Sequence, residues 1–197
     1  VHESRGWKIG MACADEKRCW VGGKRGQIYY TTDGGDTWNS ANEYSWQGMY
    51  QNPPQTPVPT PVAFTAWIRS AGIATDGSRV FFGATDNTVL RALDGVNFYN
   101  YWPVLSWNSA TWSMTCTNAT TCYGGQIKRQ VLKTTDGGET WYTAARVGTD
   151  ALNANCLSDQ YPPEGIQRRY YGIAFANENY GSVVGSCGLL YRTVNAA

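Results

Sequence analysis

The sequence predicts an all-β domain built from repeated four-stranded antiparallel units, and three observations carry this prediction. The segment 31–38, Thr-Thr-Asp-Gly-Gly-Asp-Thr-Trp, returns almost unchanged at 134–141. Glycine and aromatic residues are abundant, with 22 Gly, 9 Trp and 13 Tyr, as expected for short strands joined by tight turns. Short apolar or alternating runs precede each copy, and no segment shows a convincing helical period. The 197 residues are enough for one domain.

The first unit is expected at about 5–41. Apolar residues alternate along its first expected strand, which predicts one buried face: Trp7, Ile9, Met11 and Cys13. Two further strands are expected at 19–23 and 27–31, and Trp38 opens the fourth. The repeated segment therefore forms the turn between the third and fourth strands of an antiparallel meander.

Three more units are expected at about 64–103, 110–146 and 169–197. The second has a worn copy of the turn, in which Leu93 stands in place of the aspartate. The last unit ends at Ala197, inside its own copy and before the fourth strand. We expect a longer protein to complete it. A compact four-unit ring and a strand supplied by a partner are the alternatives.

Two long connections interrupt the repeats. Residues 51–63 are rich in proline, which predicts a stiff surface loop rather than a strand. Recognition of this segment as polyproline by a partner is an alternative. Residues 147–168 form the second long loop.

The six cysteines favour disulfides over a metal site. Two pairs share a C-x5-C spacing, Cys13–Cys19 and Cys116–Cys122, which leaves Cys156–Cys187 as a long-range pair. A zinc site usually combines tighter spacing with histidine, and His2 is the only histidine, so no metal is expected. Three disulfides predict an oxidising compartment: secreted, extracellular, periplasmic or organelle-lumenal. Six reduced thiols in the core are the alternative.

The pattern Thr-x-Asp-x-Gly-x-Thr-Trp resembles the Asp box, also called the BNR repeat. Both copies match at all five positions: Thr31, Asp33, Gly35, Thr37 and Trp38, and Thr134, Asp136, Gly138, Thr140 and Trp141. The resemblance implies a β-propeller of four-stranded blades, with the box as a structural staple in each turn. Residues 20–38 are most similar to photosystem II assembly-factor-type proteins, and the cysteine hairpins to secreted BNR-repeat proteins.

Composition excludes some functions and leaves two classes. Charged residues are 16% of the chain and the net charge is +1, which indicates no nucleic-acid footprint, and no apolar run is long enough to span a membrane. The resemblance implies a non-enzymatic scaffold that binds other protein chains, in a larger complex or a homo-oligomer. The alternative is a carbohydrate-active protein, either a sialidase-like or other glycoside hydrolase or a lectin-like module. We find no catalytic constellation and expect no cofactor.

Candidate binding residues are large side chains expected on the loops. They could stack on sugars or enter a protein interface, and they could equally fill contacts between units: Trp46, Tyr50, Trp102, Trp107, Arg168 and Arg169. Asn118 begins a glycosylation sequon, Asn-Ala-Thr, at the expected tip of a cysteine hairpin.

Overall fold

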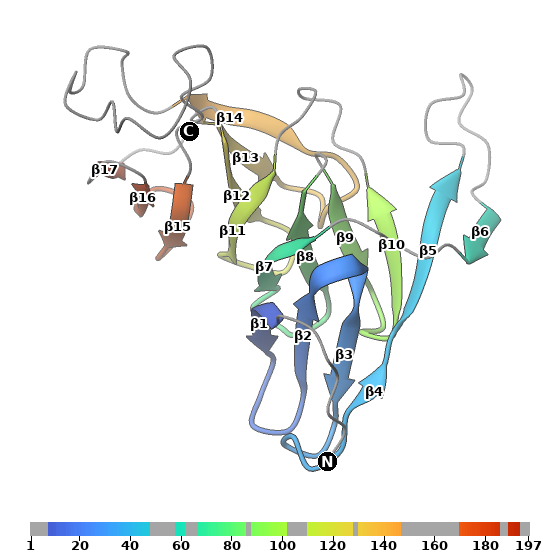
Figure 1. Ribbon diagram of the computed structural model, residues 1–197. Helices are drawn as coiled ribbons and strands as arrows, with labels where there is room; N and C mark the ends of the chain where they lie inside the picture. Colours follow the sequence, from blue (N-terminus) through green and yellow to red (C-terminus); the bar gives the residue numbers. More distant parts are fainter. Residues whose placement is uncertain are drawn as a thin grey trace, which may run out of the picture.

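The computed structural model describes most of the chain as β-strands (Figure 1). The described residues are 8–47, 58–61, 67–85, 88–101, 110–127, 130–146, 170–185 and 189–193. Within them the structure gives one complete turn of 3₁₀ helix, η1, at Lys24–Gly26. The predicted all-β class is confirmed.

Four sheets follow one another in chain order. Sheet 1 contains β1 Lys8–Cys13, β2 Cys19–Gly23, β3 Ile28–Thr31 and β4 Asn39–Ser40. Sheet 2 contains the meander β7 Ile68–Ile73, β8 Val80–Ala84, β9 Val89–Ala92 and β10 Asn97–Tyr101. Sheet 3 contains β11 Thr111–Cys116, β12 Cys122–Gln126, β13 Gln130–Thr134 and β14 Tyr142–Arg146. Sheet 4 contains β15 Tyr170–Phe175, β16 Gly181–Gly185 and β17 Leu189–Thr193.

Sheet 2 carries two strands that the sequence analysis did not predict. β5, Asn42–Gln47, pairs in parallel with β10, and β6, Val58–Pro61, pairs antiparallel with β5. The prediction that the whole of 51–63 is a loop was therefore wrong for 58–61. Proline is tolerated in β6 because an edge strand needs only one of its two rows of backbone groups for pairing.

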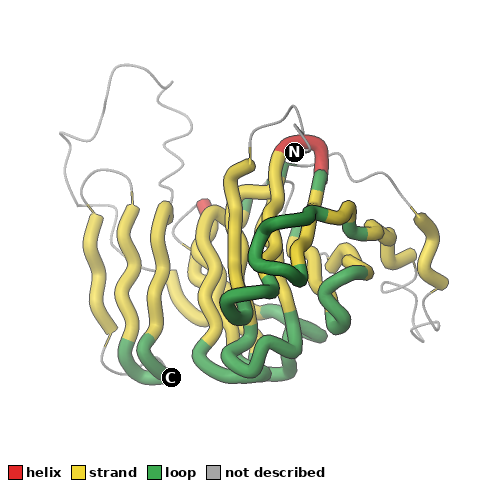
Figure 2. Tube along the Cα trace, turned by 90° about the horizontal axis from the view of Figure 1, so that it is seen from below, coloured by secondary structure: helices red, strands yellow, loops and turns green. Residues whose placement is uncertain are grey.

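The sheets stand side by side with their first strands adjacent. β1 contacts β7, β7 contacts β11, and β11 contacts β15, so these strands form a row that the remaining strands extend from (Figures 1 and 2). Each pair of neighbouring sheets buries an apolar cluster between them. The largest side chains in these clusters are Trp20 and Phe98 between sheets 1 and 2, Phe81 and Trp141 between sheets 2 and 3, and Tyr123 and Tyr170 between sheets 3 and 4.

The second strand of each sheet approaches the next sheet closely at one position. In the first three sheets this position is glycine: Gly22, Gly83 and Gly125. A Cβ on Gly83 would lie 2.7 Å from Cγ2 of Thr111, in the first strand of sheet 3. The corresponding residue of sheet 4 is Val184, which is 43% exposed. The glycines thus leave room for the side chains of neighbouring strands where sheets 1, 2 and 3 each meet the next sheet.

Candidate functional site

The two repeated turns have the same hydrogen-bond network. In the first, the Asp33 carboxylate accepts bonds from the Thr31 hydroxyl at 2.6 Å, the Thr37 hydroxyl at 2.5 Å and the Thr37 N–H at 3.0 Å. Thr31 Oγ1 also accepts a bond from the Gly35 N–H. Gly34 and Gly35 have positive φ, which glycine adopts without steric cost. All the hydrogen bonds described for the Asp33 carboxylate come from residues of its own turn.

The second turn repeats these contacts with nearly equal distances. Asp136 accepts bonds from the Thr134 hydroxyl at 2.7 Å and the Thr140 hydroxyl at 2.5 Å. Burial raises the pKa of Asp136, but the bonds from Thr140 and Thr134 lower it more, so the net shift is downward. The pKa of Asp33 is also lowered, chiefly by the hydroxyls of Thr31 and Thr37. Carboxylates held in this way are poor proton donors.

The degenerate turn of sheet 2 has a carboxylate, but it lies one residue after the aspartate position of the repeat. Leu93 is exposed, while Asp94 accepts bonds from the backbone N–H groups of Val96 and Asn97 and from the Asn97 amide. Gly95 in this turn accepts a 2.6 Å bond from Nε1 of Trp20 in sheet 1. The degenerate sequence therefore still forms a capped turn that joins two sheets.

We predict that Asp136→Asn lowers the free energy of unfolding at pH 7 by about 1–2 kcal/mol, because the turn loses charge-assisted bonds. The folded-state pKa of Asp136 lies below its ordinary value of 3.8, so its contribution is present above that value and is lost as the pH falls through the folded-state pKa. Urea unfolding across this range should show the gap between wild type and variant shrinking in acid. The exposed Asp36→Asn, in the other turn, should change stability by less than about 0.5 kcal/mol. A constant gap down to pH 2 would contradict this account.

Two disulfides close the predicted hairpins. Cys13 is bonded to Cys19 and Cys116 to Cys122, across the β1–β2 and β11–β12 turns. The predicted Cys156–Cys187 pair lies outside the described residues. Two disulfides in the described chain indicate an oxidising environment. No helix of the described chain is long and apolar enough to cross a membrane.

Asn118 lies at the tip of the second hairpin, as the sequence predicts. Its Oδ1 accepts bonds from the N–H groups of Thr120 and Thr121, and its Nδ2 donates a 3.0 Å bond to Glu178 of sheet 4. A glycan on Nδ2 would have to displace this link between sheets 3 and 4. Glycosylation at this position stays a prediction.

The structure does not describe the side chains of the six candidate binding residues proposed from sequence. Five of them lie outside the described residues: Tyr50, Trp102, Trp107, Arg168 and Arg169. For Trp46 only the backbone is described, in β5, where it pairs with Pro59. Among the described residues no group of His, Cys, Asp and Glu could hold a metal ion.

A row of cations and aromatic rings crosses the first strands of the sheets. Nζ of Lys24 lies 4.4 Å from the ring centroid of Trp67, and the Arg69 guanidinium lies 5.0 Å from Trp67 and 4.5 Å from Trp112. The Trp112 ring meets Tyr171 edge to face at 5.8 Å. We call these five residues the cation–aromatic row. Two of its aromatic rings are accessible, with Trp67 40% and Tyr171 53% exposed.

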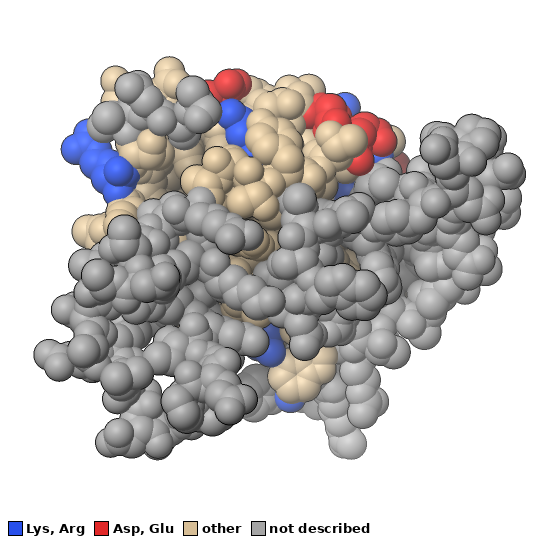
Figure 3. Space-filling view, turned by 90° about the horizontal axis from the view of Figure 1, so that it is seen from above, with Lys and Arg blue, Asp and Glu red and all other residues tan. Residues whose placement is uncertain are grey.

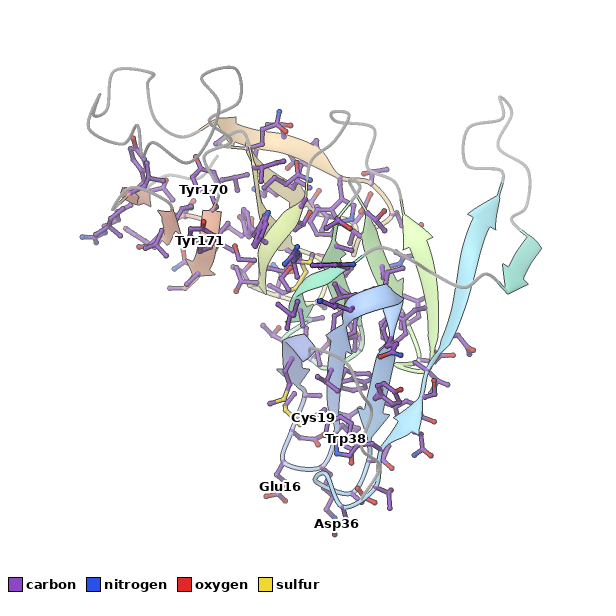
Figure 4. All side chains as sticks on the ribbon, viewed as in Figure 1. Glu16, Cys19, Asp36, Trp38, Tyr170 and Tyr171 are labelled. Atoms are coloured by element: carbon purple, nitrogen blue, oxygen red, sulfur yellow. A yellow bond between two sulfur atoms is a disulfide. The ribbon has the colours of Figure 1, made fainter. Side chains whose placement is uncertain are left out.

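Three members of the row, Arg69, Trp112 and Tyr171, lie at a bulge that recurs in all four sheets. Register shifts lie at Lys8/Gly10, Ile68/Ser70, Thr111/Ser113 and Tyr170/Gly172, so the skipped residues are Ile9, Arg69, Trp112 and Tyr171. Figure 4 shows Tyr171 on β15, far from Asp36 and Trp38 in the turn of sheet 1. Aligning the four units on their first strands would have revealed these positions, which the sequence analysis missed.

A pocket of about 400 Å³ opens between sheets 3 and 4. Its wall on sheet 3 includes Tyr123, Val131 and Lys133, and its wall on sheet 4 includes Phe175 and Tyr191. Burial raises the pKa of Tyr123, although nearby Lys133 partly opposes this, so the phenol stays protonated at neutral pH. Tyr123 also stacks on Phe175 with ring centroids 3.8 Å apart.

Comparisons with known proteins support the arrangement of the sheets. No family model matches the sequence, and no curated protein matches it. Among solved structures, U3-55K aligns with a TM-score of 0.61 at 9% identity, over 98% of this chain and 53% of that one. The GH74 xyloglucanase from Xanthomonas campestris aligns with a TM-score of 0.55 at 10% identity, over 91% of this chain and 26% of that one.

Four-stranded meanders set side by side by their first strands are the blades of a propeller. The chain has a β-propeller fold. It spans about half the length of U3-55K and a quarter of the xyloglucanase. YCF48 bound to a D1 peptide aligns with a TM-score of 0.46 at 14% identity, over 98% of this chain and 95% of that one. At these identities the comparisons show the fold alone.

Proposed function

We propose that the protein is a non-enzymatic β-propeller scaffold that binds another protein through the cation–aromatic row. The observation that carries this proposal is the exposure of Trp67 and Tyr171 in a row that runs in the order Lys24, Trp67, Arg69, Trp112 and Tyr171. Tryptophan, tyrosine and arginine are the residues most enriched where protein interfaces gain their binding energy. Because Arg69, Trp112 and Tyr171 lie on strands, they would lose little conformational freedom on binding.

The contacts within the row favour a protein ligand over a carbohydrate. Sugars stack on open aromatic faces, but Lys24 and Arg69 lie over the Trp67 ring and Arg69 over Trp112. The row therefore places cations beside its aromatic rings, which suits carboxylates and carbonyls of a polypeptide. The described atoms in Figure 3 carry charges of both signs, so short-range contacts rather than a single-sign field would select the partner. A sugar-binding role is the second candidate.

The repeated turns have a structural part in this proposal. We infer that 31–38 and 134–141 are Asp boxes, because the carboxylates of Asp33 and Asp136 accept hydrogen bonds from threonines of their own turns. Arg91 of sheet 2 also donates to Gly137 O and to Glu139 in the second turn, which ties neighbouring blades together. The paired disulfides agree with a secreted or lumenal location.

A photo-crosslinking amino acid at Tyr171 tests the proposal in cells that produce the protein. We expect a discrete crosslinked protein, and we expect none when the same group replaces Tyr180, which is 48% exposed in a turn of the same sheet. Trp67→Ala should weaken capture at Tyr171 at least tenfold, as expected for an interface hot spot of about 2 kcal/mol. Equal labelling at both positions would refute the protein-binding role. It would also be refuted if xyloglucan or sialyl oligosaccharides, added without any protein partner, protected Trp67 from a fluorescence quencher.

A further inference from the structure

A capped hairpin joins the first two strands of every sheet. In each hairpin an Asp or Asn side chain accepts hydrogen bonds from backbone N–H groups of its own turn: Asp15, Asp76, Asn118 and Asn177. Carboxylates serve as caps in sheets 1 and 2, and amides in sheets 3 and 4. An amide also carries an N–H₂ donor, which a carboxylate lacks. An asparagine cap can therefore bond to its own turn and to a neighbouring sheet at the same time.

Asn118 makes both kinds of bond. Its Oδ1 accepts bonds from the Thr120 N–H at 2.9 Å, the Thr121 N–H at 2.7 Å and the Thr120 hydroxyl at 3.1 Å. These three bonds fix the plane of the amide. Nδ2 donates a 3.0 Å bond to Glu178 in the hairpin of sheet 4, and the Thr121 hydroxyl lies 3.5 Å from the same carboxylate oxygen. The amide nitrogen of Asn118 is thus part of the contact between sheets 3 and 4.

The hairpin of sheet 3 is also anchored away from sheet 4. The Cys116–Cys122 disulfide closes its base. Ala119 O accepts a 2.8 Å bond from Nη1 of Arg79 in sheet 2, and Thr120 O accepts a 2.8 Å bond from the Gly137 N–H. A group added to the cap of this hairpin would therefore displace the hairpin of sheet 4 more readily than its own.

Asn118 begins the only Asn-x-Ser/Thr sequence in the chain, and Thr120 at its third position is exposed. N-glycosylation transfers an oligosaccharide from a lipid-linked diphosphate donor to such an amide. The bond from Nδ2 to C1 of the sugar forms, the bond from C1 to the diphosphate oxygen breaks, and Nδ2 loses one of its two protons. In the folded chain the Glu178 carboxylate lies in the way, 3.0 Å from Nδ2. Transfer would therefore take place before the two hairpins meet.

We propose that Asn118 is a glycosylation site that controls the contact between sheets 3 and 4. Without a glycan, its amide holds the hairpin of sheet 4, residues 176–180. With a glycan, sheet 4 keeps the stacking of Tyr123 on Phe175 but loses the bond at its hairpin. The hairpins lie at the ends of the first strands, whereas the bulge that carries Tyr171 lies at their beginnings. The inference therefore does not depend on the proposed function.

Secretion of the full chain from a eukaryotic host tests whether the site is used. An amidase that removes N-glycans converts a glycosylated Asn118 into aspartate, and peptide mass spectrometry detects this change. We expect the conversion in the wild type and in Thr120→Ser, which keeps the acceptor sequence, and we expect none in Thr120→Ala. An unmodified Asn118 in the secreted wild type would overturn the proposal.

Hydrogen exchange at the Ala176 amide, which bonds to Tyr180 O, tests whether the glycan and the Asn118–Glu178 bond exclude each other. In Thr120→Ala, which has no glycan, Glu178→Ala should speed exchange about threefold or more, because a hydrogen bond is lost. In the glycosylated chain the same substitution should change the rate by less than about 1.5-fold, because the bond is already absent.

Two controls keep this comparison specific. The wild-type chain produced in bacteria, which also lacks the glycan, should respond to Glu178→Ala as Thr120→Ala does, so a folding defect of Thr120→Ala would be recognised. Glu16→Ala, at an exposed position in the hairpin of sheet 1, should change neither rate. Equal acceleration by Glu178→Ala with and without the glycan would overturn the proposal, because the bond would then persist beside the glycan. Crosslinking at Tyr171 is independent of these measurements, so either proposal can fail alone.

Discussion

Replacing Phe81 with alanine is expected to lower the free energy of unfolding by about 3–5 kcal/mol, the usual cost of truncating a buried phenylalanine. Phe81 is fully buried, and its ring packs edge to face on Trp141 of the next sheet. Its cluster also includes Val89 of sheet 2 and Leu132 of sheet 3. The substitution would open a cavity where two sheets meet, so neither sheet alone could repack to fill it.

Urea unfolding followed by tryptophan fluorescence and circular dichroism measures this loss. Ser182 of sheet 4 holds the position that corresponds to Phe81, with no ring from a following described sheet against it. Ser182→Ala is therefore the matched control and should change stability by less than about 0.5 kcal/mol. A loss below about 1 kcal/mol for Phe81→Ala would show that the sheets are held by something other than this cluster.

Much of the fold could be predicted because the repeated turn is specified by residues that are close together in the sequence. Each complete copy needs hydroxyls around one aspartate and glycines at positive φ, and few residue types meet these two demands. Such a turn fixes the strands on either side of it, which placed most strands of the meanders. The degenerate turn of sheet 2 was harder to interpret because Asp94, one residue away from the expected position, supplies the carboxylate.

The prediction of a loop at 51–63 was wrong for 58–61, because the interaction that forms a strand there lies outside the segment. Local chemistry argues against a strand with prolines at 59 and 61, but β6 forms because β5 offers it an open edge. β5 in turn is placed by a parallel pairing with β10 of the next sheet. Pairings between distant segments leave no periodic signature, so sequence reasoning had no signal for them.

The candidate site was missed for a related reason. Three members of the cation–aromatic row, Arg69, Trp112 and Tyr171, are bulge residues from the first strands of different sheets, so they stand more than forty positions apart in the chain. The candidate residues instead came from aromatic clusters in the loops, which a single sequence makes conspicuous. Only the alignment of first strands brings Arg69, Trp112 and Tyr171 together.

Gly83→Val is expected to lower the free energy of unfolding by about 2–3 kcal/mol, because the added side chain has no room between sheets 2 and 3. Even a Cβ at this position would lie 2.5 Å from Oγ of Ser70 and 2.8 Å from Cβ of Thr111. Ser70 donates a hydrogen bond to Thr111 O across the sheets, so moving it aside would also break a buried contact. Valine favours strands, so the loss would come from crowding between sheets and not from β propensity.

The matched control lies at the same position of sheet 4, where the chain itself carries Val184. Val184→Ala should cost less than about 1 kcal/mol, because this residue is 43% exposed. Urea midpoints and slopes for both variants separate a loss of stability from a change in the unfolded chain. If Gly83→Val unfolds at the wild-type midpoint, the close approach of neighbouring sheets at these glycines does not hold. If Val184→Ala is as costly as Gly83→Val, the exposed face of sheet 4 contributes to folding as the enclosed faces do.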